Sequence, residues 1–243
     1  MEEVLKIVDL YKEGIINGVS FTVSKGEMIA IMGPSGSGKS SLLYQVSGMD
    51  KHDSGDVWLC KQKLEPLSED ERAKIRLEKV GFVFQHMYML KNQNIIDNIM
   101  FPAIQLYGKK ARDRIRDQAK MLMRSLNIED LANRDIISVS GGELQRACIC
   151  RSLINQPEII LADEPTGALN QSSARDVLNV FRNLNNNGVT ILMVTHDSKV
   201  AAICNRILYI TDGNIRGELS LSDITESIQR EECLSDWLSE KGW

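Results

Sequence analysis

A glycine-rich stretch at residues 33–40 carries the strongest chemical signal in the chain. It reads Gly-Pro-Ser-Gly-Ser-Gly-Lys-Ser and fits the pattern G-x-x-x-x-G-K-[ST], in which backbone N–H groups turn inward around phosphate oxygens. In that pattern Lys39 reaches the β- and γ-phosphates of a nucleotide, and the Ser40 hydroxyl binds Mg²⁺. The stretch therefore predicts nucleotide phosphate binding, which kinases, GTPases and motor ATPases share. A plain glycine-rich turn is the structural alternative.

The segments on either side of this stretch have the types that the motif requires. Residues 28–32 form an apolar run that predicts a short buried strand, and residues 40–46 have the pattern of a helix that ends at Gly48. The start of that helix adds the positive end of its dipole to the phosphate-binding backbone.

Two adjacent acids follow a later apolar segment. Residues 158–163 read Glu-Ile-Ile-Leu-Ala-Asp, and Glu164 comes next. An acid at the end of a strand beside a phosphate loop can hold Mg²⁺, and a second can orient or deprotonate an attacking water. The sequence favours the first role for Asp163 and the second for Glu164.

Gln85 and His196 also follow apolar strand patterns, at residues 80–84 and 189–194. Ligands of open α/β sheets bind at the carboxyl ends of the strands, so both side chains are candidates for the site. His196 is the one histidine of three in such a position, where it could bond a γ-phosphate or a water. Gln85, considered alone, is more typical of an ordinary loop residue.

A second candidate phosphate contact is the turn Ser140-Gly141-Gly142. Ser140 is a natural N-cap, Glu143 completes a capping box, and the two glycines leave the helix start bare. A bare helix N-terminus binds anions, although an ordinary capped helix has the same sequence. Near the N-terminus, Tyr11 could stack on a purine base or pack on its own sheet.

Composition limits the class of protein. The 243 residues include 29 basic and 33 acidic side chains, for a net charge of −4, which argues against nucleic acid as the main partner. No stretch approaches the roughly 20 apolar residues of a membrane span, and the acidic start does not resemble a signal peptide, so we expect a cytosolic protein. The five cysteines lack metal-site spacing and are expected to pack in the core.

From about residue 86 to 156 the chain changes to helical patterns, at 95–106 and 109–126, with several methionines among the apolar positions. Such a segment predicts a helical insertion. Methionine-rich helices are more often core than surface, yet exposed flexible apolar groups also suit the capture of a partner helix.

In combination, these residues resemble the nucleotide-binding subunits of ABC transporters over residues 1 to about 217. The resemblance implies an α/β fold, with a P-loop (RecA-like) ATPase core and an antiparallel β edge at residues 1–85 and 157–217. It also implies an inserted helical subdomain at 86–156, followed by a C-terminal helical tail at 218–243. The order and spacing that carry it are those of the loop at 33–40, Gln85 after Val83-Phe84, the signature-like Val139-Ser140-Gly141-Gly142-Glu143, Asp163-Glu164 and His196.

Members of that family sandwich two ATP molecules between two subunits, so the phosphate loop of one copy faces the 140–142 turn of the other. The resemblance therefore implies ATP hydrolysis with Mg²⁺ by in-line attack of water, a homodimer, and an integral membrane permease on a separate chain. It places the protein in the cytoplasm, on the inner face of the cell membrane through that permease.

The resemblance also implies a role for each matching residue. Glu164 is the expected general base, His196 the clamp on the γ-phosphate, and Gln85 the sensor that links the metal to the membrane partner. Mg²⁺ is expected on Ser40, Gln85 and Asp163. The nucleotide is expected on Tyr11, which stacks on adenine, and on Gly33, Ser35, Gly36, Ser37, Gly38, Lys39, Ser40, Ser41, Ser140, Gly141 and Gly142.

Three departures from the family pattern bear on activity. Ser41 stands where threonine is usual, and the signature has Val139 and Glu143 in place of Leu and Gln. Asn170 replaces an aspartate, which removes a charge from the expected dimer interface and could slow hydrolysis or alter coupling.

Residues 162–169 and 81–85 look most like the branch that serves macrolide export, lipoprotein release and resistance to antimicrobial peptides. Within it, the tail that ends at Trp243 is similar to bacterial peptide-resistance and peptide-sensing ATPases of the bacitracin-export type. We therefore expect a transporter ATPase for antimicrobial-peptide resistance or sensing. The alternatives are a lipoprotein-release, macrolide-export or cell-division type, a soluble ABC ATPase acting on DNA or ribosomes, and a regulatory module with low turnover.

Overall fold

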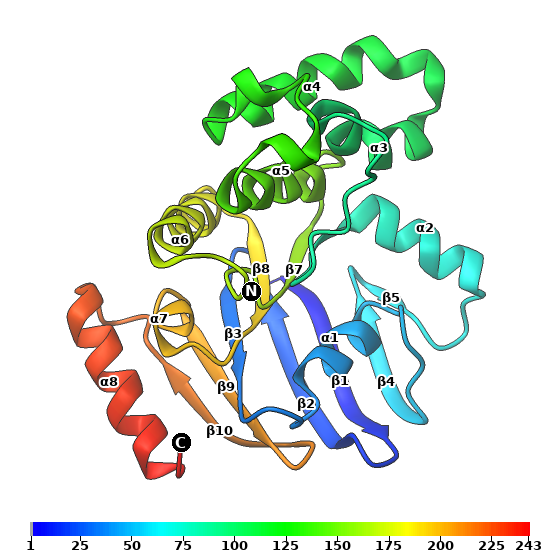
Figure 1. The fold of residues 1–243 in the computed structure, drawn as a ribbon. Coiled ribbons are helices and arrows are strands. Elements are labelled where there is room, and N and C mark those ends of the chain that lie inside the picture. The colour runs from blue at the N-terminus through cyan, green and yellow to red at the C-terminus, as the bar shows by residue number, and fades with distance from the viewer. Residues whose placement is uncertain (1) are drawn as a thin grey trace.

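The computed structural model describes residues 2–243 and contains two β-sheets with helices around them (Figure 1). The larger sheet has the strand order β10-β9-β3-β8-β7-β6. Five of its strands are parallel, and β10 pairs antiparallel to β9 at one edge. The strands are β3 (Met28–Met32), β6 (Val80–Val83), β7 (Ile159–Asp163), β8 (Thr190–Val194), β9 (Arg206–Thr211) and β10 (Asn214–Ser220).

The smaller sheet is antiparallel and has the order β2-β1-β4-β5. Its alternating buried and exposed residues are typical of a sheet with one face on the core. Together with the parallel sheet it confirms the expected α/β core with an antiparallel β edge. Its strands are β1 (Glu3–Lys12), β2 (Ile16–Ser24), β4 (Ser54–Leu59) and β5 (Gln62–Lys63).

Three of the helices gather at one end of the molecule, at the top of Figure 1, and form the inserted helical subdomain. They are α3 (Ile95–Tyr107), α4 (Arg112–Ser125) and α5 (Gly141–Leu153), joined by short 3-10 turns at Lys109–Ala111, Glu129–Leu131 and Ile136–Ser138. The other helices are α1 (Lys39–Val46), α2 (Glu69–Lys79), α6 (Gln171–Asn186), α7 (Ser198–Ala201) and α8 (Ser227–Glu240).

The central strand β3 separates two hydrophobic cores. Met28, Ala30 and Met32 belong to the core shared with the helical subdomain, whereas Ile29 and Ile31 belong to the core under the antiparallel sheet and α1. Successive side chains of a strand point to opposite faces of its sheet. A continuous apolar run is therefore required here, because β3 is buried on both faces.

The C-terminal tail differs in part from the sequence expectation. Strand β10 extends to Ser220, past the boundary expected at residue 217, and α8 begins at Ser227. Leu234 and Leu238 are buried, whereas Ile228 is 71% exposed, so α8 packs on the core through its C-terminal half.

Candidate nucleotide site

The phosphate loop lies between β3 and α1, and its glycines are needed where other backbone comes close. A Cβ on Gly33 would lie 2.0 Å from the Ile210 carbonyl oxygen, and one on Gly38 would lie 2.8 Å from the Ile15 carbonyl oxygen. Gly38 also has a φ of 93°, which glycine adopts without strain. Side chains at these positions would force the loop away from the sheet.

Two polar groups in the loop indicate that it is built for an anion. The Ser37 hydroxyl oxygen is buried and has no hydrogen-bond partner, although buried hydroxyls are normally paired. The Lys39 ammonium donates to the carbonyl oxygens of Gly33 and Pro34, each at 2.8 Å. Burial lowers the pKa of Lys39, against the opposing effect of the Glu164 and Asp163 carboxylates. These residues fit a nucleotide phosphate, with Ser35, Gly36 and Pro34 exposed at the rim of the loop.

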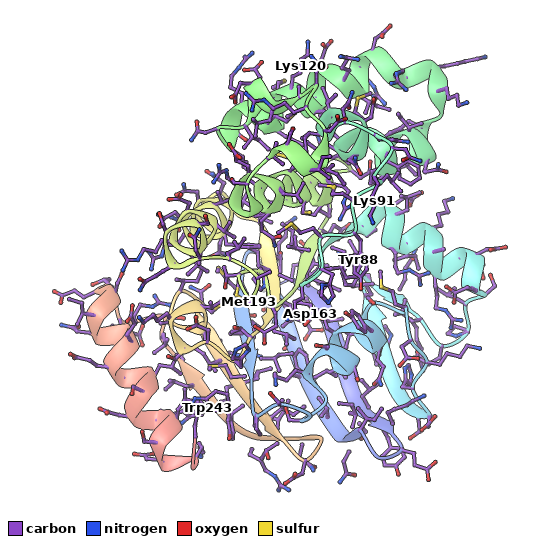
Figure 2. The ribbon with its side chains drawn as sticks, viewed as in Figure 1. Tyr88, Lys91, Lys120, Asp163, Met193 and Trp243 are labelled. Carbon is purple, nitrogen blue, oxygen red and sulfur yellow. The ribbon has the colours of Figure 1, made fainter. Side chains whose placement is uncertain are left out.

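Asp163 ends β7 beside the first turn of α1 and lies near the middle of the molecule in Figure 2. The Ser40 hydroxyl donates to Asp163 Oδ1, and the Tyr44 hydroxyl donates to Asp163 Oδ2, each at 2.8 Å. Among residues 2–243, no group of three or more His, Cys, Asp or Glu side chains forms a ready metal cage. One carboxylate and one hydroxyl are nonetheless a suitable Mg²⁺ pair, since this ion keeps several waters and uses substrate phosphates as ligands.

Tyr44 is a residue of the site that sequence reasoning missed. Burial, and then its hydrogen bond to Asp163, raise the pKa of the Tyr44 hydroxyl above its ordinary value, so the hydroxyl stays protonated at neutral pH and donates a hydrogen bond to the carboxylate. Its position four residues after Ser40 was the available signal, because side chains at i and i+4 lie on one helix face.

Glu164 and His196 form a pair at the same sheet edge. Glu164 Oε1 accepts the His196 backbone N–H at 3.0 Å and lies 2.7 Å from the His196 Nδ1 atom. The Thr195 hydroxyl donates to Glu164 Oε2 at 3.2 Å. Glu164 has a φ of 44°, a left-handed conformation that costs about 1–3 kcal/mol and is typical of active sites. The structure thus holds this carboxylate in one orientation.

Gln85 is exposed after β6, on the strand that pairs with β7. Its Nε2 atom lies 3.6 Å from the position that a Cβ on Gly167 would take, and the Gly167 N–H donates to the Glu164 carbonyl oxygen. Gln85 therefore reaches the turn that follows Asp163 and Glu164.

Tyr11 lies in β1, close to the hairpin whose tip touches the phosphate loop through Ile15. Tyr11 is 39% exposed, so the residue is partly accessible to a ligand. Ser41, the next residue of α1 after Ser40, is half-buried.

The Ser140-Gly141-Gly142 turn lies at the start of α5, in the helical subdomain. A Cβ on Gly141 would approach Leu169, and one on Gly142 would approach Ser173 of α6, so the nearest neighbours of both glycines lie outside the phosphate loop. The Ser140 hydroxyl and N–H both donate to Glu143 Oε2 at 2.7 Å. These two bonds lower the pKa of Glu143. Within one subunit, the two candidate phosphate contacts are not brought together.

Asn170 caps α6, because its side-chain oxygen accepts the Ser173 N–H at 2.9 Å. Asparagine and aspartate are equally good N-cap residues. The departure at this position therefore removes a charge and preserves the helix start.

Comparison with known proteins places this geometry in a family. The family model described as ABC transporter matches residues 16–167. This chain belongs to the ABC transporter family. It is an ATP-binding subunit of that family, and its activity is ATP hydrolysis, as the resemblance implied. No helix among residues 2–243 has the length and apolar character to cross a bilayer.

Two curated relatives illustrate the branch. The chain is 38% identical to the lipoprotein-releasing system ATP-binding protein LolD 1 of Chlorobium chlorochromatii, over 88% of this chain and 89% of that protein. It is 41% identical to the macrolide export ATP-binding/permease protein MacB of Burkholderia thailandensis, over 84% of this chain but only 31% of that protein. The chain thus spans about a third of the macrolide export protein.

Solved structures agree with the fold. The ATP-binding cassette MJ0796, in a dimeric post-hydrolysis state with ADP and Pi, is 35% identical and has a TM-score of 0.79, over 89% of this chain and 98% of that one. CbiO1 of Clostridium perfringens is 22% identical, with a TM-score of 0.83 over 97% of this chain and 92% of that one. The second likeness concerns the fold alone.

Proposed function

We propose that this ABC ATPase hydrolyses ATP with Mg²⁺ in a homodimer and powers a membrane permease on a separate chain. The observation that carries the proposal is the 2.8 Å hydrogen bond between Ser40 and Asp163. It joins the phosphate loop to the acidic strand end, and Glu164 with its partner His196 follows directly. Groups for phosphate, metal and water thereby meet at one sheet edge.

Each residue has a distinct task in this proposal. Lys39 and the loop N–H groups hold the β- and γ-phosphates, and Tyr11 stacks on the adenine. Glu164 Oε takes a proton as a water oxygen bonds to the γ-phosphorus and the bond from that phosphorus to the ADP oxygen breaks. His196 donates to the γ-phosphate. Ser40, Asp163 and Gln85 would hold Mg²⁺, which would neutralise charge on the phosphates.

Dimerisation supplies the missing contact. Since Ser140, Gly141 and Gly142 lie apart from the phosphate loop of their own subunit, we propose that they close the site of a second copy. The start of α5 can then donate N–H groups to the γ-phosphate there. The dimeric state described for the cassette MJ0796 supports this arrangement.

A groove of about 330 Å³ is the proposed docking site of the permease. It is lined by Met49, Phe82, Phe84 and Tyr88, with Arg151 and Pro102 from the helical subdomain. The rings of Phe82 and Phe84 stack at 4.8 Å, and Tyr88 meets Phe84 edge-on at 5.5 Å and is 66% exposed. Such a groove suits the apolar face of a helix from a cytoplasmic loop of the permease.

Gln85 directly follows Phe84 of this groove in sequence, which would link docking of the permease to the nucleotide. In this proposal the chain lies in the cytoplasm on the inner face of the membrane.

The proposed cargo is an antimicrobial peptide, for resistance or sensing, because the tail resembles that group. Lipoprotein release is the second candidate, favoured by the similarity to LolD 1 over nearly its whole length. A deletion strain separates the two, since it should become sensitive to bacitracin-like peptides in the first case and retain lipoproteins in the inner membrane in the second.

Turnover by the purified protein, with and without its permease, tests the ATPase itself. We expect Glu164→Gln to lower ATP hydrolysis by about 100-fold or more, the usual contribution of a general base. The proposed mechanism fails if the wild type is no faster than this variant. Co-purification from membranes tests the partner, and the transporter proposal fails if no membrane protein accompanies the tagged chain.

A further inference from the structure

The carboxylate of Asp163 receives hydrogen bonds from two hydroxyls of one helix. Ser40 donates to Oδ1 and Tyr44 donates to Oδ2, each at 2.8 Å. The two donors are four residues apart on α1, so one face of that helix presents both. Asp163 is only 3% exposed. Little water reaches this carboxylate, and the two hydroxyls are its observed side-chain donors.

The two donors are not equivalent. Under the proposed function, which this inference depends on, the Ser40 oxygen is itself a metal ligand. Tyr44 has no such task, and its bond occupies only Oδ2. We propose that Tyr44 is a positioning residue for the magnesium site: its hydroxyl fixes the rotation of the Asp163 carboxylate and so directs Oδ1 towards the metal.

The backbone contacts of Tyr44 do not depend on its hydroxyl. The Tyr44 carbonyl oxygen accepts the N–H groups of Met49 and Asp50 at 2.9 and 3.1 Å, which fixes the turn after α1. A phenylalanine would keep these backbone bonds but leave Asp163 Oδ2 without its donor. Loss of a group that orients a ligating carboxylate typically weakens metal binding by about 10- to 100-fold.

The full-length Tyr44→Phe variant tests this role, with Tyr209→Phe as the matched control. Tyr209 lies in β9 and is 5% exposed, whereas Tyr44 is half-buried, so the control deletes the same hydroxyl from a ring that is at least as well enclosed. Mn²⁺ is titrated by electron paramagnetic resonance in the presence of a non-hydrolysable ATP analogue, and the affinity for the analogue is measured separately in EDTA. We expect half-saturation by Mn²⁺ to need about tenfold more metal in Tyr44→Phe. Analogue affinity in EDTA should be unchanged in both variants, and Mn²⁺ binding should be unchanged in the control.

Two results would overturn the inference. Equal Mn²⁺ binding by Tyr44→Phe and the wild type would show that the hydroxyl does not position Asp163. A parallel loss of analogue affinity in EDTA would show a general disturbance of the loop. Failure of the wild type to bind Mn²⁺ with the analogue would instead refute the proposed magnesium site, and the inference with it, before any variant is compared.

Discussion

The starts of α1 and α5 are both expected to meet phosphate, but their first turns differ. Gly38 at the start of α1 provides no side-chain cap. The first turn of α1, which the structure describes completely, has no acidic residue. At the start of α5, Ser140 and Glu143 close a capping box. The N–H groups of α1 are therefore preorganised for an anion, whereas α5 already holds a carboxylate of its own.

This difference suggests an order of events at a composite site, in which ATP binds at the start of α1 before the start of α5 from a second copy meets it. The loop at α1 can bind ATP in a single subunit. Under the proposed function, the start of α5 would have to exchange the Glu143 carboxylate for a phosphate of the other copy, because the Ser140 hydroxyl donates to Glu143. We therefore predict that Glu143 opposes closure of the dimer.

The largest effect is expected at α1, from Lys39→Met. Removal of the ammonium leaves the phosphates without their one buried cation in the loop, and ATP turnover should fall by about 100- to 1000-fold. Lys25→Met is the control, since Lys25 is an exposed lysine at a turn, paired with Glu2 at 3.6 Å. Steady-state phosphate release measures both. If Lys39→Met hydrolysed ATP at the wild-type rate, the start of α1 would not be the preorganised phosphate site, and the contrast with α5 would fail.

A smaller effect is expected at α5, from Glu143→Gln. Glutamine keeps an oxygen for Ser140 but removes the negative charge, so dimerisation with a non-hydrolysable ATP analogue should strengthen by about two- to fivefold. Glu71→Gln is a matched control, because Ser68 and Glu71 form the same capping box on α2. Analytical ultracentrifugation gives the dimer affinity. Weaker dimerisation of Glu143→Gln would mean that Glu143 assists closure.

The smallest effect is the pH dependence of stability that the capping box confers. The bonds from Ser140 lower the pKa of Glu143 in the folded state below its ordinary value of 4.5. The stabilisation is therefore complete above pH 4.5 and disappears as the pH falls through the lowered pKa. Urea unfolding from pH 6 to about 3.5 should show a steeper loss of unfolding free energy in the wild type than in Glu143→Gln. Parallel curves would contradict this.

Much of the site could be predicted from the sequence because its chemistry is encoded locally. The phosphate loop is a contiguous motif, Asp163 and Glu164 directly follow an apolar run, and His196 ends another. The ordinary rule that ligands bind at the carboxyl ends of parallel strands was sufficient to group them. The tail was less predictable, since the exposure of Ile228 depends on how far along α8 the core extends.

The sequence by itself determined which groups are present and which strand ends carry them, because short spacings and apolar periodicity are local properties of the chain. Only the tertiary structure decided which groups meet. Tyr44 reaches Asp163 across 119 positions of sequence, and His196 reaches Glu164 across 32, because the sheet places β7 and β8 beside each other and α1 against their ends. It also decided that the α5 start lies against α6 and away from its own phosphate loop. Packing of the helical subdomain sets that separation, so no short-range sequence pattern predicts it.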